Sequence, residues 1–233
     1  MDTMKKDNIV LTGFMGTGKT TVGQLLAQHL DYKFVDTDVL IQERTGKSIP
    51  EIFEEKGEAA FRELEAALAR ELAARQGVVI STGGRMMLDP DNAAALTGTG
   101  RVFCLVATPE EILERVARDS GTERPLLAVS DPMRRIVELM QERKEEYGRF
   151  PQMMTSRKSP DVVSKNLIGI LQANPDLRVP ITASMTSYEF IVGGGILPFV
   201  TDLGGIVGPV AIVTDTNIGP RYARSCGPVD TVI

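Results

Sequence analysis

One eight-residue motif constrains this chain more than any other feature. Residues 13–20 read GFMGTGKT, which fits the pattern G-x-x-x-x-G-K-T. The apolar run NIVLT at residues 8–12 predicts a buried strand before the motif, and residues 19–30 predict a helix after it. Glycines let backbone N–H groups turn toward phosphate oxygens, and the helix directs its positive N-terminus at the same anion. The motif therefore predicts a site for a nucleoside triphosphate.

Two side chains of the motif have specific predicted roles. Lys19 can reach the β- and γ-phosphates, and the Thr20 hydroxyl can ligate Mg²⁺. A plain glycine-rich turn with a solvated lysine is the alternative, but it does not account for the fixed positions together with both flanking elements. The sequence has no N-K-x-D run to read guanine, which disfavours a switch GTPase. The loop alone leaves open whether water or a substrate receives the phosphoryl group.

Short apolar runs alternate with amphipathic runs over the first 172 residues. This alternation predicts an α/β fold in which a parallel sheet carries helices on both faces. The expected strands are residues 8–12, 32–36, 77–82 and 101–106. The expected helices are residues 19–30, 38–45, 50–56, 58–75, 109–118, 132–147 and 160–172.

The charged residues divide the chain into unequal parts. Residues 175–233 hold only 8 of the 57 Asp, Glu, Lys and Arg residues, together with 8 of the 22 glycines. ANPDLRVP at residues 173–180 is typical of a linker. We therefore expect a P-loop domain over residues 1–172, this linker, and a short α/β fragment over residues 181–233, with strand-like runs at 188–192 and 209–214.

Composition excludes several classes of function. The net charge of −5 disfavours nonspecific binding to nucleic acid or to an anionic membrane surface. No apolar run approaches the roughly 20 residues that a membrane span requires, and we expect no signal peptide at the N-terminus. Cys104 and Cys226 make no disulfide framework, which favours a cytoplasmic protein. His29 is the one histidine, which excludes a His-rich zinc site and disfavours a histidine-based triad.

Two carboxylates follow the second expected strand, in the run Asp36-Thr37-Asp38. Ligands of open α/β sheets bind at the carboxyl ends of the strands, where this run lies. One carboxylate there can hold Mg²⁺ through water, and the other can orient an attacking hydroxyl. Capping of the following helix explains the same aspartates without any chemistry, and spacing alone does not separate the two interpretations.

Three arginines and a glycine pair suggest an acidic acceptor. Arg62, Arg124 and Arg143 lie in distinct contexts, and a carboxylate substrate needs bidentate guanidinium partners. A mobile arginine can also neutralise charge on the transferred phosphoryl group. The run STGG at residues 81–84 suits a close approach of backbone to a ligand. Solvated surface arginines and a plain strand-to-loop turn are the alternatives.

Taken together, these motifs resemble the shikimate kinase family over residues 7–172. The resemblance rests on GFMGTGKTT, DTD, the run TGKSIPEIFEEKGEAAFRELE, STGG, RPLL and the R-x-x-x-Y that begins at Arg143. It implies a P-loop sheet sandwiched by helices, similar to the nucleoside monophosphate kinases, with a mobile lid near residues 119–131. It also implies transfer of the γ-phosphoryl group of ATP to the 3-hydroxyl of shikimate, in the biosynthesis of aromatic amino acids.

The resemblance also implies site roles for matching positions. The implied ATP-binding residues are Gly16, Thr17, Gly18, Lys19, Thr20, Thr21, Arg118 and Arg124. The implied shikimate-binding residues are Asp38, Arg62, Gly83, Gly84 and Arg143. Thr20 and Asp36 are the implied Mg²⁺ residues. Catalysis is expected to depend on Lys19, Asp38 and Arg124.

The sequence departs from the family pattern at Arg85, where the family has a third glycine. A glycine at a ligand-facing loop lets backbone approach closely and can adopt a positive φ, which is costly for an arginine. We expect Arg85 to weaken shikimate binding by steric obstruction. The opposite alternative is that its charge adds a contact to the substrate carboxylate.

The tail has a likeness of its own. Residues 188–223 look like the start of a 3-dehydroquinate synthase, a family that uses NAD and zinc. Asp215 and Asn217 match positions that contact NAD in that family. Because the later part of that family's pattern is missing, we expect a truncated fusion partner with no zinc and no synthase activity.

Two other functions remain as hypotheses from the sequence. One is another small-molecule P-loop kinase, of gluconate or nucleoside type, which is not expected to carry both Arg62 and Arg143. The other is a non-catalytic module weakened by Arg85, with the tail mediating association. For the favoured kinase we expect ATP and shikimate as partners, Mg²⁺ as cofactor, and a monomer unless the tail associates.

Overall fold

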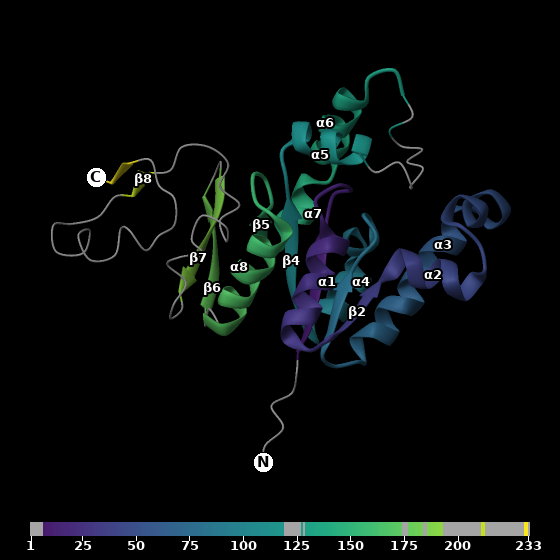
Figure 1. Cartoon of the computed structure of the whole chain (residues 1–233), viewed down its shortest axis with the longest axis horizontal. Helices are drawn as coiled ribbons and strands as arrows, with labels where there is room; N and C mark the ends of the chain where they lie inside the picture. Colours follow the sequence, from purple (N-terminus) through teal and green to yellow (C-terminus); the bar gives the residue numbers. More distant parts are fainter. Residues whose placement is uncertain are drawn as a thin grey trace, which may run out of the picture.

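The core of the protein is a five-stranded, wholly parallel sheet in the order β2-β3-β1-β4-β5. Strands β2, β4 and β5 of this sheet are labelled in Figure 1, together with the helices around them. The computed structural model describes residues 7–118, 127, 129–173, 177–183, 186–192, 211–212 and 231–232. The sheet strands are β1 (Asn8–Gly13), β2 (Lys33–Asp36), β3 (Val78–Ser81), β4 (Gly100–Val106) and β5 (Gln152–Met154).

Helices connect these strands, as the alternating sequence pattern predicts. They are α1 (Lys19–Leu30), α2 (Thr37–Thr45), α3 (Ile49–Ala73), the 3₁₀ turn η1 (Met86–Leu88), α4 (Pro90–Thr97), α5 (Pro109–Arg118), α6 (Pro132–Glu142), α7 (Lys144–Gly148) and α8 (Pro160–Ala173). The α/β fold class is therefore confirmed. Within the described residues, no helix has both the length and the apolarity to cross a membrane.

The sheet is buried on both faces because its strands are apolar at successive positions. On β1, Ile9 and Leu11 pack in one cluster with side chains of α1 and α8. Val10, between them, points to the opposite face and packs with side chains of α3 and α4. This alternation follows from the period of two in a strand, and it fixes which helices cover which face.

Two helix breaks differ in how well the sequence predicts them. Residues 50–56 and 58–75 were expected as separate helices, and α3 does contain a non-helical Gly57, with φ 79° and ψ 171°. Residues 132–147 were expected as one helix, but the structure divides them into α6 and α7 at Arg143, which has φ −105° and ψ 6°. That second expectation was wrong because no glycine or proline marks the break.

The described residues beyond 173 include four further short strands. Strands β6 (Leu177–Ala183) and β7 (Thr186–Val192) pair as an antiparallel hairpin, and β8 (Ala211–Ile212) pairs in parallel with β9 (Thr231–Val232). Strand β6 begins inside the segment that the sequence analysis assigns to a linker. The division into domains stays a prediction.

Candidate active site

An open cavity of about 1630 Å³ lies at the carboxyl ends of β1, β2 and β3. It is larger than the roughly 300–1,000 Å³ of a site for one small molecule, so it has room for two ligands side by side. Loop 13–20 lines one part, and the acceptor-side residues of α2, α3 and α7 line another. Predicted site residues on its wall are Gly16, Thr17, Gly18, Lys19, Thr20, Thr21, Asp36, Asp38, Arg62, Gly83, Gly84 and Arg143.

The phosphate loop depends on close packing at its first glycine. Gly13 has φ 131°, and a Cβ there would lie 2.3 Å from the carbonyl oxygen of Leu105 on β4. The Lys19 Nζ folds back over the loop and donates to the carbonyls of Gly13 and Phe14, at 2.9 Å each. A cationic group is thus held at the place where the N-terminus of α1 meets the loop, which suits a polyphosphate.

Asp36 joins the phosphate loop to the start of α2. Its Oδ2 accepts a hydrogen bond from the Thr20 hydroxyl at 2.8 Å. Its Oδ1 accepts from the backbone N–H groups of Asp38 and Val39 at 3.1 and 3.4 Å, which caps α2. The capping interpretation of this aspartate is therefore confirmed, and its other oxygen faces the phosphate loop.

Asp38 has an environment that favours its protonated form more than usual. Its pKa is raised to about 6, first by burial and then by the charges of Asp36 and Glu65, while the charges of Lys19 and Arg62 act in the opposite direction. A Cβ added at Gly83 would lie 2.4 Å from Asp38 Oδ1. Gly83 is thus required to leave room for this carboxylate, so the glycine is more than a plain turn residue.

Arg62 projects from α3 and is held on several sides. Its Nη1 donates to the buried Glu65 at 2.5 Å, and its Nε and Nη2 donate to Glu58 at 3.2 and 2.8 Å. The guanidinium also lies near the Phe53 and Phe61 rings, at 6.0 and 5.3 Å from their centroids. Glu58 and Glu65 are not among the residues predicted from the sequence, although carboxylates at i−4 and i+3 from an arginine on a helix are a usable signal.

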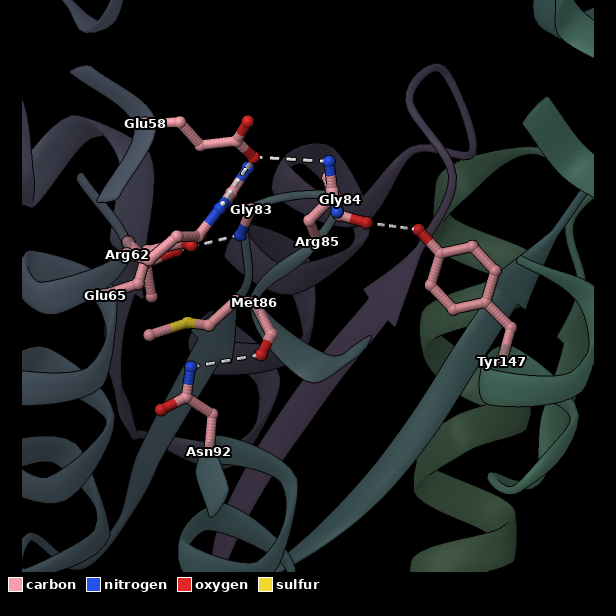
Figure 2. A network of polar contacts seen from close by, with 10 residues as sticks. Glu58, Arg62, Glu65, Gly83, Gly84, Arg85, Met86, Asn92 and Tyr147 are labelled. Carbon is pink, nitrogen blue, oxygen red and sulfur yellow. Dashed lines mark hydrogen bonds and ion pairs between the residues drawn. The ribbon is translucent and has the colours of Figure 1, made fainter. Parts of the chain in front are cut away.

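Two side chains lie beside the glycine pair at residues 83–84. They are Arg143, at the junction of α6 and α7, and Tyr147, on α7. Arg143 is only 8% exposed, and its guanidinium lies 5.4 Å from the centroid of the Phe14 ring. The Tyr147 hydroxyl donates to the Gly84 carbonyl (Figure 2). Burial raises the pKa of Tyr147 to about 12, so it remains a donor at neutral pH. The R-x-x-x-Y pattern therefore anchors the loop as well as presenting a cation.

Arg85 does not carry the backbone strain that the sequence analysis expects. Its φ of −121° and ψ of −9° lie outside the left-handed region. Its Nη1 reaches Glu58 Oε1 at 3.2 Å, and 54% of its side chain is exposed at the cavity rim. The predicted strain is absent because the chain turns into η1 here without a positive φ.

Three arginines near or after α5 differ in how they relate to the phosphate loop. Arg115, which the sequence analysis missed, donates from Nη1 to the Gly16 carbonyl at 3.3 Å and to Thr155 Oγ1 at 2.9 Å. Arg118 is 74% exposed, pairs with Glu114 at 2.5 Å and does not line the cavity. Arg124 lies outside the described residues, as does most of the expected lid at 119–131.

Comparisons with known proteins agree with this geometry. A model of the shikimate kinase family matches residues 15–172. The shikimate kinase of Enterococcus faecalis is 41% identical over 164 residues, which cover 70% of this chain and 96% of that protein. The shikimate kinase of Caldanaerobacter subterraneus subsp. tengcongensis is 48% identical over 140 residues, covering 60% and 81%.

Solved structures lead to the same group of proteins. The structure of shikimate kinase from Acinetobacter baumannii in complex with shikimate superposes with a TM-score of 0.67 at 34% identity. The superposition covers 72% of this chain and 94% of that one. A phosphate loop, a buried carboxylate and two arginines on one cavity are thus accompanied by similarity over nearly the whole length of these enzymes. The chain belongs to the shikimate kinase family.

Proposed function

We propose that this shikimate kinase binds ATP against the phosphate loop and shikimate between α3 and α7, within the one cavity. The reaction transfers the γ-phosphoryl group of ATP to the 3-hydroxyl of shikimate. The observation that carries the assignment of roles is that Lys19, Asp38, Arg62 and Arg143 all line the same cavity. Positioning and charge stabilisation supply most of the catalysis in such transfers, so this convergence is what the chemistry requires.

On the nucleotide side, the backbone and side chains of loop 16–21 hold the phosphates, with Lys19 on the β- and γ-phosphates. The resemblance to the family supports roles for Arg118 beside the base and Arg124 in a lid over the phosphates. A closed lid would exclude water and so suppress hydrolysis of ATP without acceptor.

The residues near the phosphates fit a hard divalent cation, and we propose Mg²⁺. Thr20 and Asp36 offer a hydroxyl and a carboxylate within one hydrogen bond of each other. Among the residues that the structure describes, no group of three or more His, Cys, Asp or Glu forms a metal cage. Mg²⁺ suits such a site because it keeps several waters and binds through substrate phosphates. When bound, the cation neutralises charge on the phosphate oxygens.

On the acceptor side, Arg62 and Arg143 bind the carboxylate of shikimate, while the backbone of Gly83 and Gly84 contacts its ring substituents. Asp38 accepts a hydrogen bond from the reacting hydroxyl. As that oxygen bonds to the γ-phosphorus, the bond from phosphorus to the β–γ bridging oxygen breaks and the proton passes to Asp38. A carboxylate whose pKa lies near 6 is ionised at neutral pH and is still basic enough for this role.

ADP release measured across shikimate, gluconate and nucleosides tests the function. We expect Mg²⁺-dependent release with shikimate well above the release with the other acceptors. Preference for gluconate or a nucleoside would assign the chain to a different class of P-loop kinase. No acceptor-dependent release at all would favour a non-catalytic module.

The remainder of the chain supports more limited proposals. Residues 173–180 join the kinase domain to residues 181–233, which resemble the start of a 3-dehydroquinate synthase and are not expected to bind zinc. Cys104 is a free, buried thiol, which fits a cytoplasmic location. We expect a monomer unless the tail associates, and light scattering of the whole chain measures this. Stoichiometric zinc in a metal analysis would contradict the proposal for the tail.

A further inference from the structure

The rim of the acceptor side holds an ion triplet made of Glu58, Arg62 and Arg85 (Figure 2). Both arginines donate to the same oxygen, Glu58 Oε1, at 2.8 Å from Arg62 Nη2 and 3.2 Å from Arg85 Nη1. Glu58 and Arg62 belong to α3, whereas Arg85 follows β3. One carboxylate is therefore shared between α3 and the segment that follows β3.

Glu58 occupies the edge of Arg62 that a substrate carboxylate would use. The Nε and Nη2 donors of Arg62 are both on Glu58, and Nη1 is on Glu65. A bidentate pair needs two parallel N–H donors of one guanidinium. A carboxylate substrate can thus take the Nε and Nη2 edge only after Glu58 has left it.

Arg85 offers Glu58 a second partner at the rim of the same cavity. Its side chain is half exposed and already lies within hydrogen-bond distance of Glu58 Oε1. Glu58 also follows Gly57 directly, the position at which α3 loses its helical geometry. A small movement of the Glu58 side chain toward Arg85 would release the Arg62 edge and keep the carboxylate paired.

The charges around the acceptor side favour the same exchange. Arg62, Arg85 and Arg143 carry three positive charges, and the ionised Asp38, Glu58 and Glu65 carry three negative ones. These six groups therefore balance before the substrate carboxylate binds. Without Arg85, the remaining five groups would carry one excess negative charge, which would disfavour binding of a carboxylate substrate.

We propose that Arg85 is a positioning residue for the acceptor, because it holds Glu58 while the substrate carboxylate binds Arg62. This inference rests on the proposed binding of shikimate beside Arg62. It reverses the sequence-based expectation for Arg85, since removal of the side chain is predicted to weaken shikimate binding. Glu58 becomes a competitor for Arg62 when Arg85 is absent.

A double-mutant cycle on Arg85→Gly and Glu58→Gln tests this proposal. Shikimate Kd is measured by calorimetry, and kcat and the KM values for shikimate and ATP are measured by ADP release. Arg85→Gly is expected to raise shikimate Kd and KM about threefold to fivefold, the range of exposed ion pairs. Its kcat and its KM for ATP are expected to change less than about twofold.

Adding Glu58→Gln to Arg85→Gly is expected to restore shikimate KM to within about twofold of wild type, because the competitor is gone. Glu58→Gln alone is expected to have less than about a twofold effect, and Arg85→Lys to keep most of the affinity. Arg134→Ala is the matched control, since Arg134 is exposed and its partner Glu138 lies with it on α6, away from the cavity lining.

Three results would overturn the proposal. They are a lower shikimate KM in Arg85→Gly, an unchanged one, or additive effects of the two substitutions. If the wild-type chain phosphorylates shikimate but the effects of the two substitutions on shikimate KM are additive, this inference is wrong and the proposed function stands. A wild-type chain that neither binds nor phosphorylates shikimate would remove both.

Discussion

At the scale of residues, the site is built by carboxylates that serve structure and chemistry together. Asp36 caps α2 with one oxygen and receives the Thr20 hydroxyl on the other. Glu65 is 1% exposed, and burial raises its pKa while Arg62 pulls it down. Such a buried carboxylate fixes the arginine beside it, since leaving either partner alone would be costly. Asp38 remains the carboxylate that is free of a capping role.

Replacing Asp38 with Asn tests its assignment as the group that receives the acceptor's proton. The substitution keeps the shape and removes the charge, so we expect kcat to fall by about 10²-fold or more while the KM for ATP changes little. Steady-state kinetics with both substrates measure this. Asp91→Asn, at an exposed aspartate in the first turn of α4, is the control. A loss confined to ATP binding would move Asp38 to the nucleotide side.

Replacing Gly83 with Ala tests the room that Asp38 needs. The new Cβ would lie 2.4 Å from Asp38 Oδ1 and 3.2 Å from Glu65 Oε1, so the carboxylate must shift. Because small misplacements of reacting groups cost about 10²-fold in rate, we expect a large fall in kcat. Gly148→Ala, where nothing lies within 4 Å of the added Cβ, is expected to be nearly neutral. Equal activity of the two variants would show that Asp38 tolerates the contact.

At the scale of elements, α2 and α3 are joined by an ion-pair group at the surface. Glu71 on α3 receives Arg44 of α2 at 2.6 Å and Arg75 at 2.5 Å. The hydrogen bond from Arg44 is the largest cause that lowers the pKa of Glu71 to about 2. The folded pKa is therefore depressed, so this group stabilises the fold above the unfolded pKa near 4.5 and loses that effect as pH falls toward 2.

Unfolding at pH 7 and pH 3 measures this contribution. We expect Glu71→Gln to lower the free energy of unfolding at pH 7 by about 1 kcal/mol or less, since the pair is well exposed and screened by solvent. The difference from wild type should shrink at pH 3. Glu63→Gln, at an exposed site on the same helix, is the comparison. A difference in the free energy of unfolding that grows at low pH would contradict the stabilising role of the Glu71 ion pairs.

The sequence predicts some elements better than others for physical reasons. The break at Gly57 is visible because glycine disfavours a helix, whereas the break at Arg143 has no local signal. Strand β5 has only three residues, too few to give a periodic pattern. The pairing of Arg85 with Glu58 joins residues 27 positions apart, so it depends on tertiary packing that no local pattern encodes.

At the scale of the whole molecule, the five-stranded sheet and the helices around it lie within the first 173 residues. Among the residues that the structure describes, those that line the cavity lie between Met15 and Val163, and the sheet ends with β5. Helix α8 completes one face, with Val163, Leu167 and Ile170 packed beside Leu26 of α1. The family pattern, the phosphate motif and its strand–helix context could all be predicted from sequence, because they are local or fixed by spacing.

A chain ending at residue 173 tests this division. We expect it to keep kcat and both KM values within about twofold, because the described cavity residues all precede the cut. Leu167→Ala within that shortened chain should destabilise it by about 2–5 kcal/mol, as a fully buried leucine leaves a cavity. Loss of activity on shortening alone, with the unfolding temperature preserved, would assign the tail a part in catalysis.

The most direct test of the central claim is ³¹P NMR of the whole protein with ATP, Mg²⁺ and shikimate. The account predicts ADP together with one new phosphomonoester resonance that matches shikimate 3-phosphate, and no such product from Lys19→Ala. ADP accompanied only by inorganic phosphate, or the same product from Lys19→Ala at the wild-type rate, would contradict it.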